Sequence, residues 1–199
     1  MISAESTKTK EPVKQTKTLD LVYIAIGAAL ISVCSWISIP TPVPFTLQTM
    51  AVFAILLLLG GDRGTFSILT YIVMGAIGLP VFSGFRGGVS VLFGNTGGYI
   101  LGFLLTGLLY LLFTRKSGQK TGIEIVALVL GLLVCYAFGT AWFMYIYLRD
   151  TGSVGVWTVL GWCVFPFILP DLIKMALAFV LAKRVKPVIR GRDASSSKS

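Results

Sequence analysis

The sequence predicts an all-α membrane protein with six transmembrane helices, and three observations lead to this fold class. The 199 residues are 55% hydrophobic and only 13% charged, and the mean hydropathy is +0.86. A soluble domain of this length could not cover its surface with so few polar side chains, so the lipid bilayer is the expected solvent. The apolar residues also form runs of helix length, with basic clusters at their ends.

The net charge of +9 does not indicate nucleic-acid binding, because basic residues beside apolar runs are typical of membrane orientation. The first eighteen residues are polar and include four lysines, and the apolar run after them lacks a cleavage signature. We expect residues 1–18 to be a cytosolic basic tail, residues 19–186 the six-helix transmembrane domain, and residues 187–199 a disordered cytosolic tail.

The first span is predicted at residues 19–39, about 31 Å of helix, which matches a hydrocarbon core of about 30 Å. It ends at residues 40–44, where three prolines cannot continue a helix. The second span covers residues 47–60 and stops at a glycine-rich polar turn, residues 60–64. The third covers residues 65–78.

A glycine-rich segment, residues 78–103, follows the third span. It contains eight glycines and a single charge, Arg86, among apolar residues. It is too apolar for a solvated loop and too rich in glycine for an ordinary helix or strand. Long irregular segments of this kind usually have a function, such as a lid or a binding loop.

The fourth span begins near residue 96 and ends at residues 115–116, and the fifth covers about residues 124–148. The last apolar region, residues 154–182, is interrupted by Pro166 and Pro170. A helix starting at Pro170 would extend only about 18 Å before the basic terminus. We therefore expect its N-terminus to be buried within the protein.

Positive charges predict the orientation of these six spans. If both termini lie on the same side of the membrane, 14 of the 17 Lys and Arg residues lie on that side too. The three exceptions are Arg86, Arg149 and Lys174. The side with the excess of Lys and Arg is normally the cytoplasmic one. The sequence thus predicts both termini in the cytosol.

Asp171 and Lys174 are the strongest candidate functional residues. They lie three residues apart, on one helix face, among apolar neighbours. Charges in membrane segments are costly and mark functional sites by default. The free backbone N–H groups at the start of a helix that begins at Pro170 would also point toward Asp171 and Lys174. The alternative is a structural ion pair that fixes the last helix to its neighbours.

Arg86 suits a carboxylate ligand, but it could equally be a surface residue at the outer interface. Asn95 and Tyr99 belong to a glycine-rich stretch in which close backbone approach and an aromatic ring could hold a ring-shaped ligand. Asn95 and Thr96 could also serve as the N-cap of the fourth helix.

Gln48, at the outer end of the second helix, offers both a donor and an acceptor to an amide or urea; it could instead face lipid headgroups. Ala25 and Ala29 place small residues four apart on the first helix. Such a face lets a second membrane helix approach closely, although alanine is common in membrane helices.

Several motifs are absent. The sequence has no nucleotide-binding P-loop, no metalloprotease or nucleophile-elbow motif, no histidine, and three isolated cysteines. We therefore predict no cofactor, no metal and no disulfide. A binding component energised by other subunits fits this combination. The alternatives are a small membrane enzyme with Asp171 and Lys174 as acid and base, and a structural subunit without a ligand.

Three motifs in order, within residues 40–49, 78–99 and 166–174, resemble those of the BioY family, the biotin-specific S-components of energy-coupling factor (ECF) transporters. The resemblance covers about residues 19–185. It implies six membrane helices, cytosolic termini, a biotin site near the outer face and no enzymatic activity. The implied partners are a transmembrane coupling protein, which docks on Ala25 and Ala29, and two ATPase subunits.

The resemblance also implies that the glycine-rich segment is a lid over biotin. On this basis Asp171 accepts hydrogen bonds from the ureido N–H groups, and Lys174 or Asn95 donates to the ureido carbonyl. The candidates for the carboxylate are Arg86, Thr46 and Gln48. Residue 95 departs from the family, where proline is common, and its amide could add a ligand contact.

Overall fold

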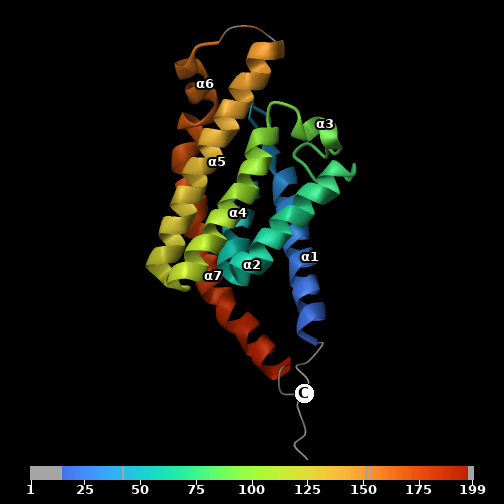
Figure 1. The fold of residues 1–199 in the computed structure, drawn as a ribbon, viewed down its shortest axis with the longest axis vertical. Helices are drawn as coiled ribbons and strands as arrows, with labels where there is room; N and C mark the ends of the chain where they lie inside the picture. The colour runs from blue at the N-terminus through green and yellow to red at the C-terminus, as the bar shows by residue number, and fades with distance from the viewer. Residues whose placement is uncertain (1–14, 42, 151, 153, 197–199) are drawn as a thin grey trace, which may run out of the picture.

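The structure, a computed structural model, describes residues 15–41, 43–150, 152 and 154–196. The chain forms a helical bundle (Figure 1) and has one small β hairpin. Five helical stretches in the described residues are long and apolar enough to cross a membrane. The elements are α1 (Gln15–Trp36), β1 (Ser38–Ile39), β2 (Phe45–Thr46), α2 (Gln48–Ala76), α3 (Val89–Leu92), α4 (Gly97–Ser117), α5 (Thr121–Asp150), α6 (Val156–Cys163) and α7 (Phe165–Ser196).

The proline-rich stretch after α1 forms a hairpin. β1 and β2 pair antiparallel, with Ser38 opposite Thr46 and Ile39 opposite Phe45. α1 ends at Trp36, four residues before Pro40 and three before the predicted end, and the hairpin returns the chain to the start of α2. The two strands were not predicted, because two residues are too few to show a periodic pattern.

α2 contains the second and third predicted spans, which meet at a sharp reversal. Gly60 has φ 82° and ψ 177°, a conformation that only glycine adopts easily. A β-carbon at Gly64 would lie 3.1 Å from the Cα of Leu56, whereas eight residues of straight helix span about 12 Å. The two arms of α2 therefore fold back on each other. The predicted polar turn, residues 60–64, shrinks to Gly60 alone.

α4 and α5 pack closely against each other through small residues. A β-carbon at Gly131 would lie 2.6 Å from the Thr106 methyl, and one at Gly139 would lie 2.4 Å from the Tyr99 ring. The Thr106 hydroxyl also donates to the Gly131 carbonyl at 2.9 Å. Small residues at membrane helix interfaces permit this close approach.

The last apolar region differs from the sequence prediction. α7 begins at Phe165, after a break at Val164, and Pro170 lies inside it. Proline there removes one hydrogen bond, to the carbonyl four residues earlier, which membrane helices tolerate. The prediction of a helix starting at Pro170, with free N–H groups aimed at the site, is wrong. The N–H groups of Phe167 and Ile168 in the first turn bond to the Val164 carbonyl.

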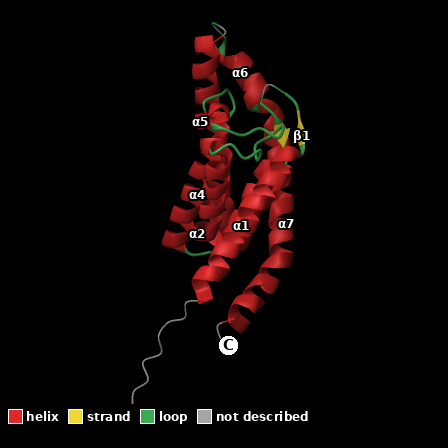
Figure 2. Cartoon of the chain, turned by 90° about the vertical axis from the view of Figure 1, so that its right-hand side faces the viewer, coloured by secondary structure: helices red, strands yellow, loops and turns green. Residues whose placement is uncertain are grey.

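α7 is helical through Ser196, whereas the sequence predicted disorder from residue 187 onward. The tail at residues 1–14 and residues 197–199 lie outside the described residues. The start of α1 and the end of α7 lie at the same end of the bundle, and most of the loops and the β hairpin lie toward the other (Figure 2).

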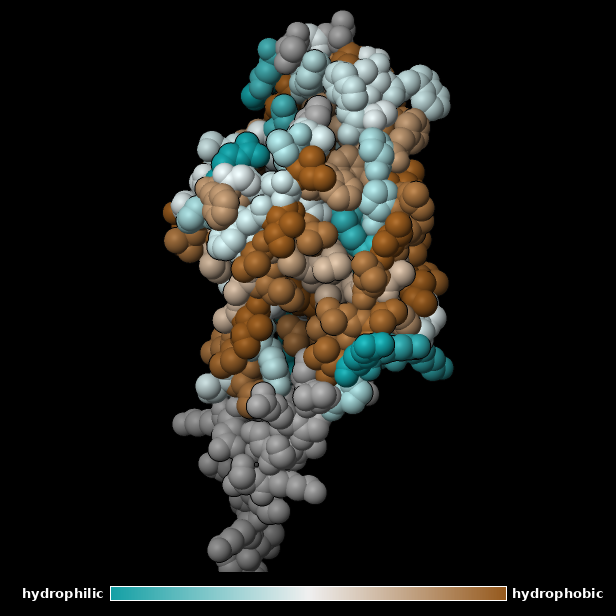
Figure 3. All heavy atoms as spheres, turned by 180° about the vertical axis from the view of Figure 1, so that it is seen from behind, coloured by the Kyte–Doolittle hydropathy of each residue, from teal (hydrophilic) through white to brown (hydrophobic). Residues whose placement is uncertain are grey.

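The surface is that of a membrane protein. Figure 3 shows a wide band of hydrophobic side chains across one face, with hydrophilic side chains above and below it. Many large apolar side chains are exposed on several helices, which lipid would cover. They include Leu21, Ile26, Phe66, Leu112, Leu133, Leu169 and Leu181.

Candidate substrate-binding site

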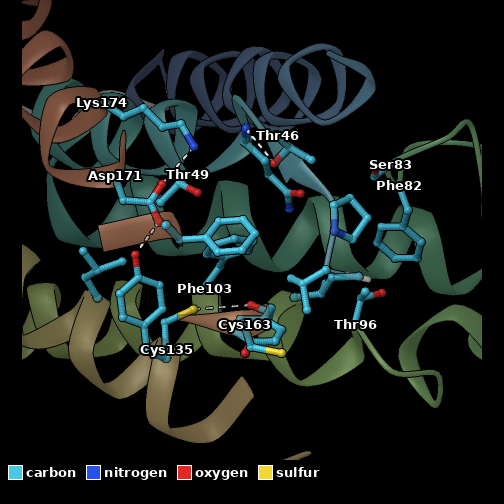
Figure 4. A pocket seen from close by; sticks show the side chains of 18 of the residues that line it. Thr46, Thr49, Phe82, Ser83, Thr96, Phe103, Cys135, Cys163, Asp171 and Lys174 are labelled. Atoms are coloured by element: carbon cyan, nitrogen blue, oxygen red, sulfur yellow. Dashed lines mark hydrogen bonds and ion pairs between the residues drawn. The ribbon is translucent and has the colours of Figure 1, made fainter. Parts of the chain in front are cut away.

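A cavity lies among α2, α4, α5, α7, the hairpin and the loop after α2 (Figure 4). We call that loop, residues 78–88, the lid loop. The side chains around the cavity leave about 700 Å³ free of protein atoms, open solvent at the mouth included, and about 70 Å³ of this space is open to the centre of a water-sized sphere. Its polar lining consists of Thr46, Gln48, Thr49, Ser83, Arg86, Thr96, Tyr99, Tyr136, Asp171 and Lys174.

The charged residues of α7 lie at one end of this cavity, opposite Phe82, Ser83 and Thr96 (Figure 4). Asp171 is 2% exposed and Lys174 is 5% exposed. Lys174 Nζ lies 2.9 Å from Asp171 Oδ1. Because both residues belong to one helix, their ion pair does not itself fix α7 to a neighbour. Their position in a cavity favours ligand binding over a purely structural ion pair.

Tyr136, from α5, completes the polar cluster around Asp171. Its hydroxyl donates to Asp171 Oδ2 at 2.6 Å. The carboxylate thus accepts one hydrogen bond on each oxygen and retains further lone pairs for a ligand. The sequence alone does not single out Tyr136, because a tyrosine in an apolar helix looks like a core residue.

The Lys174 ammonium lies 4.0 Å from the centre of the Phe45 ring, which holds it by a cation–π interaction. Phe45 in turn packs against Phe167, with ring centres 5.7 Å apart. An ammonium has three donors, and Asp171 uses one of them. The cluster therefore offers a ligand an anionic acceptor and a cationic donor at the same place.

The hairpin and the start of α2 contribute Thr46 and Gln48. The Thr46 hydroxyl accepts a hydrogen bond from the Gln48 backbone N–H at 3.2 Å. Gln48 is 5% exposed, and its side-chain Nε2 is buried with no hydrogen-bond partner. The alternative that Gln48 faces lipid headgroups is wrong. A buried, unpaired donor in a cavity is instead available to a ligand oxygen.

The lid loop covers the other end of the cavity. Phe82 and Arg86 form a two-residue bridge, with N–O distances of 2.9 and 3.3 Å. Phe82 is 1% exposed, and its ring meets the Tyr71 ring edge-on at 5.4 Å. The loop is thus an ordered cover for the cavity.

Arg86 lies at the junction between this cavity and a more open outer groove. The groove is lined by Thr41, Pro44, Arg86, Ser90, Val91, Gly94, Asn95 and Thr96. Arg86 is exposed, and its Nε donates to the Ser83 carbonyl at 3.1 Å. Asn95 lines the groove but not the cavity. Among the seven predicted binding residues, Asn95 alone lies outside the cavity lining.

Tyr99 contributes its ring to the cavity wall. Its hydroxyl is paired with the Thr140 hydroxyl at 2.9 Å and is therefore engaged within the protein. Thr96 is the N-cap of α4 but makes no side-chain capping hydrogen bond. The N-cap position predicted at Thr96 is therefore confirmed without a capping hydrogen bond from its side chain, and the contact of the Tyr99 ring with a ligand stays a prediction.

Apolar and sulfur-containing side chains form the rest of the wall. Cys135 and Cys163 are both buried and free of disulfides, and both line the cavity. Phe82, Phe103 and Phe167 add aromatic surface. Such a wall suits an apolar or sulfur-containing ring. No cluster of three His, Cys, Asp or Glu side chains that could hold a metal occurs in the described residues.

Ala25 and Ala29 do not line the cavity and lie on the exposed side of α1. The opposite side of α1 packs on α2, where a β-carbon at Gly27 would lie 2.4 Å from Ser67 Oγ. The two alanines are thus open to another membrane helix.

The sequence matches known proteins over most of its length. The profile of the BioY family matches residues 6–191. The chain is 40% identical to the biotin transporter BioY of Thermotoga maritima, over 83% of this chain and 95% of that protein. It is 36% identical to the biotin transporter BioY2 of Lactococcus lactis, over 84% of this chain and 90% of that protein.

The fold matches a solved structure as well. The crystal structure of an S-component for biotin from an ECF-type ABC transporter superposes with a TM-score of 0.77 and 28% identity. The match covers 89% of this chain and 95% of that one. The resemblance found in the sequence is confirmed, and the chain belongs to the BioY family.

Proposed function

We propose that this chain is the biotin-specific S-component of an ECF-type ABC transporter, a multi-pass protein of the prokaryotic cell membrane. It binds biotin with high affinity, and ATPase subunits on other chains energise uptake. The observation that carries this proposal is the buried Asp171–Lys174 pair at the end of a cavity in a BioY-family chain. Membership in this family assigns the chain to transporters rather than enzymes.

The chemistry of biotin matches the cavity from end to end. Its ureido group has two N–H donors and one carbonyl acceptor. Asp171 supplies the acceptor for the N–H groups, and Lys174 supplies the donor for the carbonyl. The thioether ring then lies against the aromatic and sulfur-containing wall.

The valerate carboxylate points toward the lid loop in this orientation. Arg86 is the charged candidate there, and Gln48 has an unpaired donor. Asn95 shares the outer groove with Arg86, so it suits the carboxylate end rather than the ureido carbonyl. Thr46 and the Tyr99 ring complete the set of contacts.

Six spans result if each arm of α2 counts as one. Several Lys and Arg residues lie at the end of the bundle with α1's start and α7's end. Arg63 pairs with Asp20 there, Arg115 with Asp62, and Lys186 with Glu124. The positive-inside rule then orients both termini to the cytosol.

The proposed partners are a transmembrane coupling protein and two ATPase subunits, with Ala25 and Ala29 as the docking face. Ala29→Trp should abolish ATP-driven uptake in cells that contain these subunits and leave biotin binding by the purified chain unchanged. Leu133→Trp, at an exposed position on α5, is the matched control. Equal uptake by both variants would exclude this docking face.

Titration of the purified chain with biotin tests the function. We expect one site per chain, and we expect mass spectrometry to find biotin chemically unchanged after prolonged incubation. Dethiobiotin, which keeps the ureido group and the carboxylate, should also bind. Absence of biotin binding would contradict the proposed function, and chemical conversion of biotin would support an enzyme instead.

A further inference from the structure

The lid loop is fastened to α1 by two residues that do not line the cavity. The Ser35 hydroxyl lies 2.5 Å from the Val81 carbonyl, and the Trp36 indole N–H donates to the Pro80 carbonyl at 2.9 Å. The Trp36 ring also stacks on Phe85, with ring centres 5.0 Å apart and planes 26° apart. Ser35 is fully buried.

We propose that Ser35 and Trp36 are positioning residues that latch the lid loop shut and so control how fast the substrate enters and leaves. This inference rests on the proposed function, because biotin has to pass the lid loop. Neither residue touches the substrate. Both act through the backbone of the loop.

The latch acts on the two lid residues that reach the cavity. Its acceptors, the carbonyls of Pro80 and Val81, directly precede Phe82. Phe82 in turn bonds Arg86 through both backbone groups. Holding these two carbonyls in place therefore also holds the Phe82 ring and the Arg86 side chain in place.

A strained residue at the tip of the lid loop supports this assignment. Phe85 has φ 57° and is the one non-glycine residue with positive φ in the described part of the chain. A bulky side chain adopts this conformation only when its surroundings enforce it. Its ring is 64% exposed, and Trp36 is its stacking partner. Strain of this kind is common at switches and clamps.

The ends of the lid loop are held separately from its middle. The Leu79 N–H bonds the Met74 carbonyl at 3.1 Å, and the Gly88 N–H bonds the Gly75 carbonyl at 2.7 Å. Both of these acceptors belong to α2, whereas the latch belongs to α1. Between these ends the Phe82 ring also packs on Tyr71 of α2, so a broken latch loosens the backbone of the middle while the ends stay attached.

Trp36, one of the two latch residues, lies on the same face of α1 as the alanines proposed for docking. Trp36 follows Ala29 by seven residues and Ala25 by eleven. A helix turns by about 100° per residue, so the side chain of Trp36 points within about 20° of the direction of Ala29 and of Ala25. One side of α1 therefore carries the proposed docking alanines and Trp36, whereas Ser35 faces the protein interior.

Biotin association and dissociation rates of purified Trp36→Phe test the proposal. The variant removes the indole donor and keeps an aromatic ring beside Phe85. Loss of one hydrogen bond to a gate should raise both rates about three- to tenfold and leave Kd nearly unchanged. Phe85→Leu, which removes the stacking partner instead, should act in the same direction. Trp157→Phe, the same change at an exposed position on α6, should have no effect.

If biotin dissociates faster from the variant but associates at the wild-type rate, Trp36 stabilises the bound state and does not control entry. If neither rate changes, Trp36 does not hold the lid loop. Either result overturns the latch. Hydrogen exchange without ligand separates this test from that of biotin binding. The amides of Phe82 and Arg86, which bond each other's carbonyls, should exchange faster in Trp36→Phe than in the wild-type chain. Equal exchange would also overturn the latch.

Discussion

Two clusters of similar composition lie at different levels of the bundle. In the cavity, at the end opposite the lid loop, Asp171 accepts from Lys174 at 2.9 Å and from Tyr136 at 2.6 Å. At the end with the chain termini, Glu124 accepts from Lys186 at 2.9 Å and from Tyr110 at 3.1 Å. Each cluster contains a buried carboxylate, a lysine and a tyrosine.

Their settings separate their roles. The Glu124–Lys186 ion pair joins α5 to α7, and Tyr110 adds α4, so this cluster clamps three helices together. The Asp171–Lys174 ion pair lies within α7 and lines the cavity. Desolvating a charge pair is costly, and a pair within one helix returns less tertiary stabilisation than one between helices. A buried ion pair is therefore a better sign of function when it faces a cavity and both partners belong to one helix.

Asp171→Asn should produce the largest difference between the two clusters. Losing a charged acceptor weakens binding by about 1.5–3 kcal/mol, or about 10- to 150-fold in Kd. Titration of the purified variant with biotin measures this. An unchanged Kd would remove Asp171 from the site.

Glu124→Gln should produce the converse result. It leaves Lys186 without its counter-ion and should lower stability by about 1–2 kcal/mol, which corresponds to a fall of about 2–8 °C in unfolding temperature. The Kd for biotin should stay within about twofold of the wild-type value. A large loss of affinity together with a normal unfolding temperature would contradict the clamp.

The two tyrosines give the smallest and most closely matched comparison. Tyr136→Phe removes one donor to Asp171 and should weaken biotin binding by about 0.5–1.5 kcal/mol. Tyr110→Phe makes the same chemical change beside Glu124 and should lower only the unfolding temperature. Equal effects on affinity would show that the two clusters do not differ in role.

Much of this arrangement could be predicted from the sequence, because polar and charged residues are rare inside a membrane and therefore mark helix ends and functional sites. Asp171 and Lys174 stand out as charges among apolar residues, and the ends of α4 and α5 coincide with polar or basic residues. Gln48 was identified from its place after the prolines. The structure adds its burial and its unpaired amide.

The remainder depends on contacts between residues far apart in the chain. Tyr136 has no local mark that distinguishes it from a core tyrosine, and only the fold brings it to Asp171. α7 starts in an apolar interior, where no change in polarity marks the boundary, and a proline within its second turn was mistaken for its start. The chain reverses at Gly60 alone, so the turn predicted from the glycine-rich residues 60–64 is longer than the real one.

A structure of the biotin complex tests the central claim most directly. We expect biotin in the cavity, with its ureido group within about 2.7–3.2 Å of Asp171 or Lys174 and its carboxylate toward Arg86. Glu124 and Lys186 should keep the contact that they make without ligand. Biotin bound outside the cavity, or inside it without a contact to either Asp171 or Lys174, would contradict the account.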